Sequence, residues 1–143
     1  MSVEENKEIV RKYVQDLLID RNYDHAVDQV GPNFKIDRSA MPEAIAGAEG
    51  LHRQMDMLNE AFPDLELQIA DIFGEGDKVA VRFIAPGTHT GDFLGMAPTG
   101  VKVLWKGNVI YEVQDGRVQQ AWACWDDVGL IQTIEKASGS KAS

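Results

Sequence analysis

Apolar residues in the first half of the chain recur at helical spacing. Those between residues 9 and 18 fall three or four positions apart on one face, which predicts an amphipathic helix. Ser2 followed by Glu5 is a capping-box pattern and predicts where this helix begins. Two further helices are predicted over residues 24–30 and about 48–62, because a Gly-Pro pair and a Pro-Asp pair follow them as stop signals.

The second half of the chain alternates apolar and polar residues, which is the pattern of half-buried strands. Strands are predicted over residues 65–69, 78–85, 101–113 and 117–126. Asp115-Gly116 separates the last two and is a strong signal for a tight hairpin. Residues 33–47 and 86–100 are expected to be irregular, and a short helix is expected over 128–134. Helices followed by antiparallel strands favour an α+β fold, with the helices on one face of a curved sheet.

Composition narrows the class of protein. A chain of 143 residues is expected to form one domain, here residues 1–136, followed by a flexible C-terminal tail over 137–143. The net charge of −9 and the absence of a Lys/Arg run argue against a partner nucleic acid or anionic membrane surface. The chain has no apolar run long enough for a signal peptide or membrane span, so a cytoplasmic protein is expected. Its one cysteine and the lack of a His/Cys cluster predict neither an intrachain disulfide nor a metal site.

The hairpin at Asp115-Gly116 predicts which side chains of the last two strands share a face. For a two-residue loop, the facing pairs on one side are Tyr111–Gln120, Val109–Trp122, Gly107–Cys124 and Trp105–Asp126. Asp127 then falls on the wetter side together with Lys106. Gly107 leaves room on the aromatic side that a ligand could occupy. A slip of one residue would exchange the two faces.

Asp126 is therefore predicted to line an apolar pocket and to transfer protons. Burial among aromatic rings disfavours the ionised form of a carboxyl group and makes its carboxylate a stronger base. The alternative reading is that Asp126 is an exposed strand end or caps the helix that follows. Because an unpaired aspartate is rarely buried, the pattern by itself favours the alternative.

Several motifs in this order and spacing resemble one known family. They are Phe62-Pro63-Asp64, Gly87-Thr88-His89-Thr90-Gly91, Pro98-Thr99-Gly100, Asp115-Gly116-Arg117-Val118 and Trp122-Ala-Cys-Trp125-Asp126. Together with Gly129-Leu130 they resemble the SnoaL-like polyketide cyclase family, also called ester cyclase-like, within the nuclear transport factor 2-like superfamily. The resemblance runs from the first helix to Leu130. It implies a cone-shaped α+β barrel, in which N-terminal helices close a curved antiparallel sheet over a pocket, and a homodimer that pairs through a sheet face.

The resemblance also implies a reaction. Characterised cyclases of the family close a ring by intramolecular aldol condensation of a small molecule, without a metal or cofactor. Their catalytic aspartate matches Asp126 in this chain, which makes Asp126 the leading candidate for the base. It would remove a proton from a carbon flanked by carbonyls, and the enolate would attack a second carbonyl of the same substrate.

Other candidate residues have a functional and a structural interpretation. His89 is the candidate proton donor or enolate partner, or else a loop histidine bonded to backbone. Arg82 either contacts an anionic or carbonyl group or pairs with a surface carboxylate, and the second is favoured. Tyr13 either packs in the core with its hydroxyl at the pocket rim or acts as a catalytic acid, and the first is favoured. His25 and His52 are expected at the surface or its boundary. The expected substrate-binding residues are Trp105, Trp122, Cys124, Tyr13, Arg82, Val109 and Gln120.

Two departures from the family pattern leave the reaction open. A histidine often found shortly after the position of Phe34 is absent, and the neighbourhood reads Lys35-Ile36-Asp37-Arg38. A glutamate often found before the first tryptophan is Gln120 here. Alternatives to a cyclase or isomerase are therefore a hydroxylase-like enzyme, a dehydratase, an epoxide hydrolase or a non-catalytic module that binds a small molecule.

Overall fold

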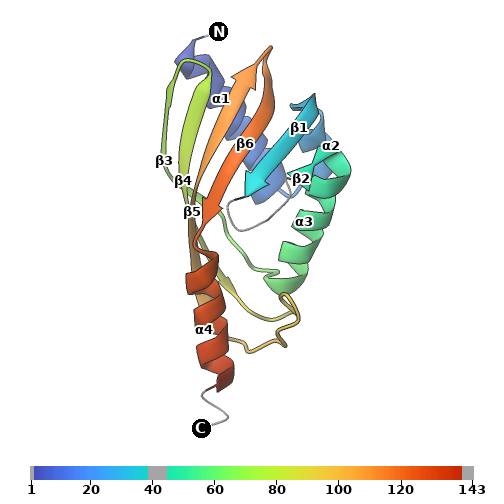
Figure 1. Cartoon of the computed structure of the whole chain (residues 1–143), viewed down its shortest axis with the longest axis vertical. Coiled ribbons are helices and arrows are strands. Elements are labelled where there is room, and N and C mark those ends of the chain that lie inside the picture. The colour runs from blue at the N-terminus through green and yellow to red at the C-terminus, as the bar shows by residue number, and fades with distance from the viewer. Residues whose placement is uncertain (1, 39–44, 140–143) are drawn as a thin grey trace.

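Four α-helices and a six-stranded sheet make up the described part of the chain. The structure is a computed structural model that describes residues 2–38 and 45–139. The helices are α1 (Val3–Val14), α2 (Tyr23–Val27), α3 (Gly47–Ala61) and α4 (Asp127–Gly139), with a π-helical segment η1 (Gln15–Ile19) after α1. The strands are β1 (Val30–Arg38), β2 (Ile45–Ala46), β3 (Gln68–Glu75), β4 (Lys78–Thr88), β5 (Lys102–Gln114) and β6 (Arg117–Trp125). The expected α+β class is confirmed, and Figure 1 shows the elements.

Helix α1 begins as its sequence predicts. The Ser2 hydroxyl accepts a hydrogen bond from the backbone N–H of Glu5, and the Glu5 carboxylate accepts one from the backbone N–H of Ser2. This capping box pairs backbone donors that the first turn leaves without helical partners. The apolar stripe of α1 is buried, with Val10, Tyr13 and Val14 almost fully covered. The helix then continues directly into η1.

The sheet is mixed and open rather than a closed antiparallel barrel. The strand order is β2-β1-β6-β5-β4-β3, and every pair is antiparallel except β1 with β6. Strand β1 occupies residues that the sequence assigns to the end of a helix and to an irregular segment, so that assignment is wrong for 30–38. Its partner β6 lies 85 to 88 residues further along the chain, as Lys35 with Gln120 and Val30 with Val118 show, and pairing with so distant a strand has no local sequence signal.

The remaining boundaries shift by a few residues. Helix α3 matches its predicted span, whereas α2 ends at Val27. Strand β3 extends to Glu75 because the turn before β4 is only Gly76-Asp77. Helix α4 continues through Ala137 to Gly139, and residues 140–143 of the expected tail lie outside the described residues. None of the described helices is both long and apolar enough to cross a membrane.

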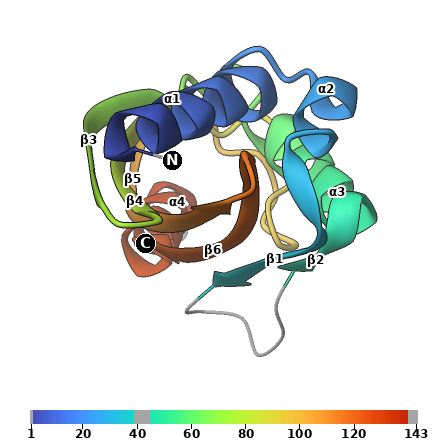
Figure 2. The ribbon, with the colours of Figure 1, turned by 90° about the horizontal axis from the view of Figure 1, so that it is seen from above.

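The sheet curves around one side of the molecule, and helices close the other. Viewed from above, α1 and α3 lie against the concave face of the sheet with α2 between them at one corner (Figure 2). The core fills the space between these layers. Helix α4 follows β6 and extends beyond the end of the sheet (Figure 1).

A bulge in β6 sets which side chains face the core. Pairing starts as the two-residue loop predicts, with Gln114 opposite Arg117 and Val113 opposite Val118. Gln119 is then an extra residue, and the register shifts by one beyond it. The observed pairs are Glu112–Gln120, Tyr111–Ala121, Ile110–Trp122, Val109–Ala123, Asn108–Cys124 and Gly107–Trp125. The two faces of β6 are therefore exchanged relative to the sequence prediction, which is wrong for every residue beyond Gln119.

The convex face of the sheet carries a row of apolar side chains. Four outward-facing residues on successive strands are directly paired across the sheet: Phe73, Ala80, Ile110 and Trp122. We call these four residues the outer apolar row. Phe73 is 63% exposed and Ile110 is 44% exposed, whereas Trp122 is partly covered by the ammonium group of Lys78, 5.8 Å from the ring centroid.

Candidate functional site

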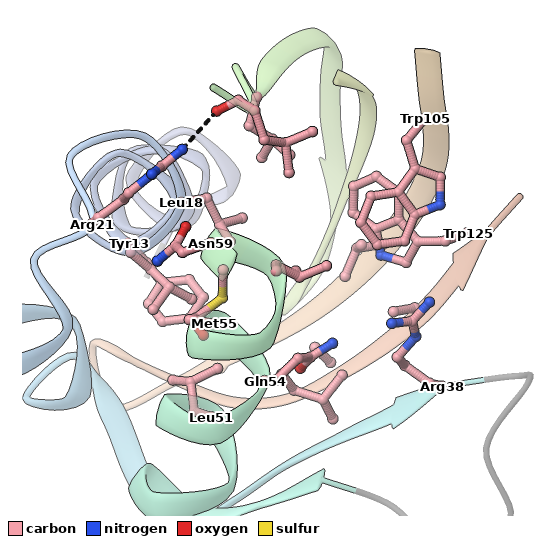
Figure 3. A pocket seen from close by; sticks show the side chains of 18 of the residues that line it. Tyr13, Leu18, Arg21, Arg38, Leu51, Gln54, Met55, Asn59, Trp105 and Trp125 are labelled. Carbon is pink, nitrogen blue, oxygen red and sulfur yellow. Dashed lines mark hydrogen bonds between the residues drawn. The ribbon is translucent and has the colours of Figure 1, made fainter. Parts of the chain in front are cut away.

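A pocket opens between the helices and the concave face of the sheet. The cavity itself has a volume of about 70 Å³, and the space between its walls is about 750 Å³ when the open mouth is counted. Most of its wall is apolar. Its lining residues are Tyr13, Leu17, Leu18, Arg21, Ile36, Arg38, Leu51, Gln54, Met55, Leu58, Asn59, Leu65, Leu67, Trp105, Val109, Tyr111, Ala121, Ala123 and Trp125. Figure 3 shows Arg38, Trp105 and Trp125 on one side of the pocket and Arg21 and Tyr13 on the other.

Aromatic rings build one side of the pocket over a glycine. The Trp125 ring lies on Gly107, its cross-strand partner, so closely that a Cβ atom there would come within 2.5 Å of the indole. The same ring stacks on Phe83 at 5.5 Å between centroids and an interplanar angle of 16°. It also contacts the Trp105 ring, with 4.6 Å between the ring centroids. Trp125 therefore occupies the space above Gly107 in which the sequence analysis expects a ligand.

Arg38 brings a guanidinium group to the same side. Its side chain is only 8% exposed, and its Nη2 donates to both carboxylate oxygens of Asp127 at 2.8 Å. The Arg38 Cζ atom lies 5.7 Å from the centroid of the Trp105 ring. Strand β1 supplies Arg38 and the first turn of α4 supplies Asp127, so the pair ties the parallel strand to the end of β6.

Two buried tyrosines face each other on the wall between α1 and β5. The Tyr13 and Tyr111 rings pack edge to face at 5.9 Å. Burial raises the pKa of Tyr13 well above its usual value, and the neighbouring Tyr111 adds to the rise. Burial also raises the pKa of Tyr111. Both hydroxyls therefore stay neutral at ordinary pH, and neither has a hydrogen-bond partner among the described residues. Tyr13 lines the pocket in the structure, and its role in binding a substrate stays a prediction.

The opposite side of the pocket is polar but internally bonded. Arg21 adopts a left-handed backbone conformation, with φ of 58°. Its guanidinium donates to the Leu65 carbonyl oxygen at 3.0 Å. The Asn59 amide is hydrogen bonded to the Tyr23 hydroxyl. These groups are thus held by the protein itself. Within the described ranges, no three His, Cys, Asp or Glu side chains lie close enough together to hold a metal ion.

Asp126 lies outside the pocket. Its carboxylate is exposed and accepts a hydrogen bond from the backbone N–H of Gly129 at 2.9 Å, while its carbonyl oxygen accepts one from Leu130. Asp126 is therefore the N-cap of α4. The predicted burial of Asp126 beside Trp105 is wrong, because the bulge at Gln119 turns this side chain to the other face. Its catalytic role stays a prediction.

His89 lies in the core, away from the pocket lining. Its ring is fully buried against Phe62, at 5.7 Å between centroids. Its Nδ1 accepts from the Thr99 backbone N–H at 3.3 Å and lies 3.0 Å from the Thr99 hydroxyl. The backbone of His89 also bonds to Val101 and Gly100. This geometry matches the interpretation of His89 as a structural loop histidine.

The other predicted lining residues divide into two groups. Trp105 and Val109 lie in the pocket as expected. Trp122, Cys124 and Gln120 are on the opposite face of β6, so the bulge makes these three assignments wrong. Arg82 is exposed and donates to Asp71 at 2.7 Å, which confirms the favoured reading of a surface pair. His25 and His52 are exposed, as expected.

Sequence reasoning missed Arg38, Tyr111 and Trp125 as lining residues. Tyr111 already falls on the aromatic face of the predicted hairpin, and a signal for Trp125 is present in the chain. Val118 and Ala121 both read as inward residues but are three positions apart, and only an extra residue between them puts both on one face. Moving the register by one then places Trp125 inside. Arg38 has no such signal, because its strand was not predicted.

The comparisons with known proteins agree with this architecture. The sequence profile of the SnoaL-like polyketide cyclase family matches residues 8–134. A candidate SnoaL-like polyketide cyclase from Jannaschia sp. CCS1 has a TM-score of 0.84 and 26% identity, covering 92% of this chain and 92% of that chain. AclR, a candidate hydroxylase from Streptomyces galilaeus, has a TM-score of 0.82 and 26% identity, covering 94% and 83%.

A third solved structure, a candidate polyketide cyclase from Acidithiobacillus ferrooxidans, has a TM-score of 0.81 and 25% identity over 96% of this chain and 99% of that chain. A search of curated protein sequences found no match. Members of the matched family bind small-molecule substrates. Because the family profile covers most of its length, the chain belongs to the SnoaL-like polyketide cyclase family.

Proposed function

We propose that the chain is a cyclase that holds a polyketide-like, carbonyl-rich small molecule in the pocket between α1, α3 and the sheet. The observation that carries this proposal is the lining, in which apolar and aromatic walls surround a few polar side chains. Pockets for small molecules have this composition, because apolar walls supply affinity and a few polar groups fix orientation. Membership in the cyclase family supports an enzyme of this type.

The proposed reaction is an intramolecular aldol closure without a cofactor. A proton leaves a carbon flanked by two carbonyls, the enolate carbon bonds to a second carbonyl carbon, and the resulting alkoxide takes up a proton. No atom is lost and no electron is exchanged with a second reagent. Because both reacting groups belong to one flexible molecule, walls that hold it folded supply a large part of the acceleration.

The two tyrosines are suited to assist carbonyl groups. Tyr13 and Tyr111 are buried, neutral and without protein hydrogen-bond partners among the described residues. A neutral hydroxyl in a water-poor pocket donates a hydrogen bond to an oxygen that gains charge in the transition state. We assign this role to either hydroxyl, depending on how the substrate lies.

Two aspartates are candidates for the proton acceptor. The family resemblance points to Asp126, whose carboxylate caps α4 on the outside. The geometry favours Asp127, because it bonds to Arg38, which lines the pocket. The described lining itself contains no carboxylate. The proposal therefore gives the acid–base role to Asp127 and keeps Asp126 as the alternative.

A matched pair of variants tests the assignment. Asp127→Asn and Asp126→Asn are assayed with β-polyketone esters, with ring closure followed by chromatography and mass spectrometry. A general base contributes about 10²–10⁴-fold, so Asp127→Asn should lower turnover at least about 100-fold. Asp126→Asn keeps an equally good cap and should stay within about twofold. A large loss in Asp126→Asn with little loss in Asp127→Asn would return the acid–base role to Asp126. If the unmodified protein closes no ring, the cyclase proposal is wrong.

One observation favours a second function. Because no carboxylate is present in the described lining, the pocket can bind a carbonyl compound without performing chemistry on it. A non-catalytic binding module is then the competing proposal. Tight binding of a β-polyketone that is recovered unchanged, with no product above a heat-denatured control, would favour this module over the enzyme.

We further propose that the chain forms a homodimer through the convex face of its sheet. The outer apolar row provides the contact area, and rows of charged and polar residues border it, among them the pairs Lys78–Glu112 and Asp71–Arg82. An apolar strip with a polar border is the usual composition of a protein interface.

A further inference from the structure

One end of the pocket holds hydrogen-bond donors for which the described residues provide no acceptor, namely the indole N–H of Trp105 and part of the Arg38 guanidinium. We infer that Arg38 and Trp105 form a subsite for a negatively charged oxygen of the ligand, either a carboxylate or an enolate. This inference rests on the proposed function in one respect, namely that the pocket holds the substrate. It goes further by specifying which chemical group enters first and where that group lies.

The first donor is the indole N–H of Trp105. The residue is 3% exposed and lines the pocket, and its Nε1 atom is buried with no hydrogen-bond partner among the described residues. Buried donors in folded proteins are almost always paired, since an unpaired one loses its hydration without compensation. A ligand oxygen in the pocket would supply the missing acceptor.

The second donor group is the guanidinium of Arg38. Among the described residues, its hydrogen bonds are the two that Nη2 donates to Asp127. A guanidinium has five N–H groups in a planar fork, so Nε and Nη1 keep donors for another partner. Asp127 and the Trp105 ring hold the group in place, with Cζ 5.7 Å from the ring centroid. Such a fixed, planar donor set matches the two oxygens of a carboxylate or of an enolised β-dicarbonyl.

The charges along the wall favour an anion over a cation. The lining contains the cations Arg21 and Arg38 and, among the described residues, no anion. Asp127, which is not a lining residue, pairs with Nη2 of Arg38. The other N–H groups of Arg38 can bind a ligand carboxylate, so the guanidinium would bridge Asp127 and the ligand. Apolar rings and aliphatic side chains surround this end, so the substrate class is an aromatic or polyketide-derived molecule with an acidic oxygen.

Equilibrium binding of matched probes tests the inference. Naphthoate and its neutral isostere naphthamide share one ring system, and a cyclic triketone that ionises as an enol supplies the enolate without a carboxyl group. Affinities are measured by isothermal titration. An ionic hydrogen bond is lost in the amide, so naphthoate should bind at least about tenfold more tightly than naphthamide.

Three single variants and one double variant locate the effect. Arg38→Met should remove the preference for the anion, and Trp105→Phe, which keeps a ring but no N–H, should lower it about three- to tenfold. Arg82→Met removes an exposed arginine outside the pocket and should change neither affinity. Arg38→Met leaves Asp127 unpartnered, so the double variant Arg38→Met/Asp127→Asn repeats the measurement without an isolated charge, and melting curves verify that each variant is folded.

The outcomes are distinct. A preference for naphthoate or the triketone that Arg38→Met abolishes supports the subsite, and the probe that binds identifies carboxylate or enolate as the source. Equal affinities for acid and amide, a preference that survives Arg38→Met, or no saturable binding of any anion overturns it. Because binding is measured without turnover, ring closure by a protein with no anion preference would refute only the subsite. Anion preference without ring closure would refute only the cyclase.

Discussion

Two neighbouring carboxylates at the junction of β6 and α4 face different surroundings. The exposed carboxylate of Asp126 accepts a hydrogen bond from the backbone N–H of Gly129, whereas the carboxylate of Asp127 pairs with Arg38, which lines the pocket. The glycine at 129 permits this arrangement, because a Cβ atom there would come within 2.3 Å of the Asp126 carboxylate. The chemistry open to each aspartate follows from the face on which it lies rather than from its sequence motif.

The capping role of Asp126 gives a prediction on stability. Asp126→Ala removes the N-cap of α4 and should lower the free energy of unfolding by about 1 kcal/mol, whereas Asp126→Asn should change it little, since asparagine caps as well as aspartate. Urea unfolding followed by circular dichroism measures both. Asp56→Ala, an exposed aspartate within α3, is the control and should have little effect. Equal losses in the alanine and asparagine variants would show that charge, and not capping, is what matters.

Residue-level predictions succeed where they depend only on strand identity. Trp105 and Val109 of β5 are inside as predicted, because their alternation does not involve the bulge. Trp122 and Cys124 of β6 are misplaced, because every residue beyond Gln119 is shifted by one. His89 and Arg82 are placed correctly by their structural alternatives, which rest on ordinary hydrogen bonding and ion pairing.

At the scale of elements, local signals identify helices and the hairpin well. The capping box at Ser2, the apolar stripe of α3 and the Asp115-Gly116 turn all act over a few residues, and each is found in the structure. Strand β1 is different. Only Phe34 and Ile36 give it an alternating pattern, and its stability comes from β6, which is distant in sequence. Tertiary pairing of this kind outweighs local propensity.

The bulge at Gln119 gives a prediction for β6 as an element. Deleting Gln119 leaves Val118 opposite Val113 and Gln120 opposite Glu112, so the inner face stays the same. This variant should remain folded, with a loss of about 1–2 kcal/mol from the altered strand twist. Inserting one alanine after Gln119 is the matched opposite change. It turns Trp125 outward and moves polar residues into the core, which should cost several kcal/mol.

Urea unfolding and the intrinsic tryptophan fluorescence distinguish these two variants. The deletion should preserve a cooperative transition and the native emission spectrum, because Trp125 keeps its contact with Trp105. The insertion should lose both. A destabilising deletion and a tolerated insertion would mean that the inner face of β6 is set by something other than this bulge.

At the scale of the whole molecule, the pocket and the core share the same tyrosines, which predicts an alkaline limit to stability. Tyr13 and Tyr111 have pKa values raised above the usual 10.0 by burial. Above about pH 10 the unfolded chain loses phenolic protons that the folded chain keeps, so stability is complete below the usual tyrosine pKa and falls as pH rises past it. Urea titrations between about pH 8 and 11 measure this fall. The double variant Tyr13→Phe/Tyr111→Phe should flatten it, and an unchanged slope would locate the effect in other groups.

The convex face of the sheet gives the last prediction, on assembly. In the outer apolar row across four paired strands, Phe73 is 63% and Ile110 is 44% exposed, and a second copy placed on the row would cover these apolar side chains. A stable interface buries about 800 Å² per partner, so the polar residues that border the row would have to join the contact. We therefore expect a dimer of twice 15.8 kDa in analytical ultracentrifugation.

Ile110→Glu puts a charge in the middle of the outer apolar row and should yield monomers. Val128→Glu, at a residue 66% exposed on α4, is the control and should leave the dimer intact. Sedimentation of the unmodified protein as a monomer, or an Ile110→Glu variant that still dimerises, would exclude this face as the interface.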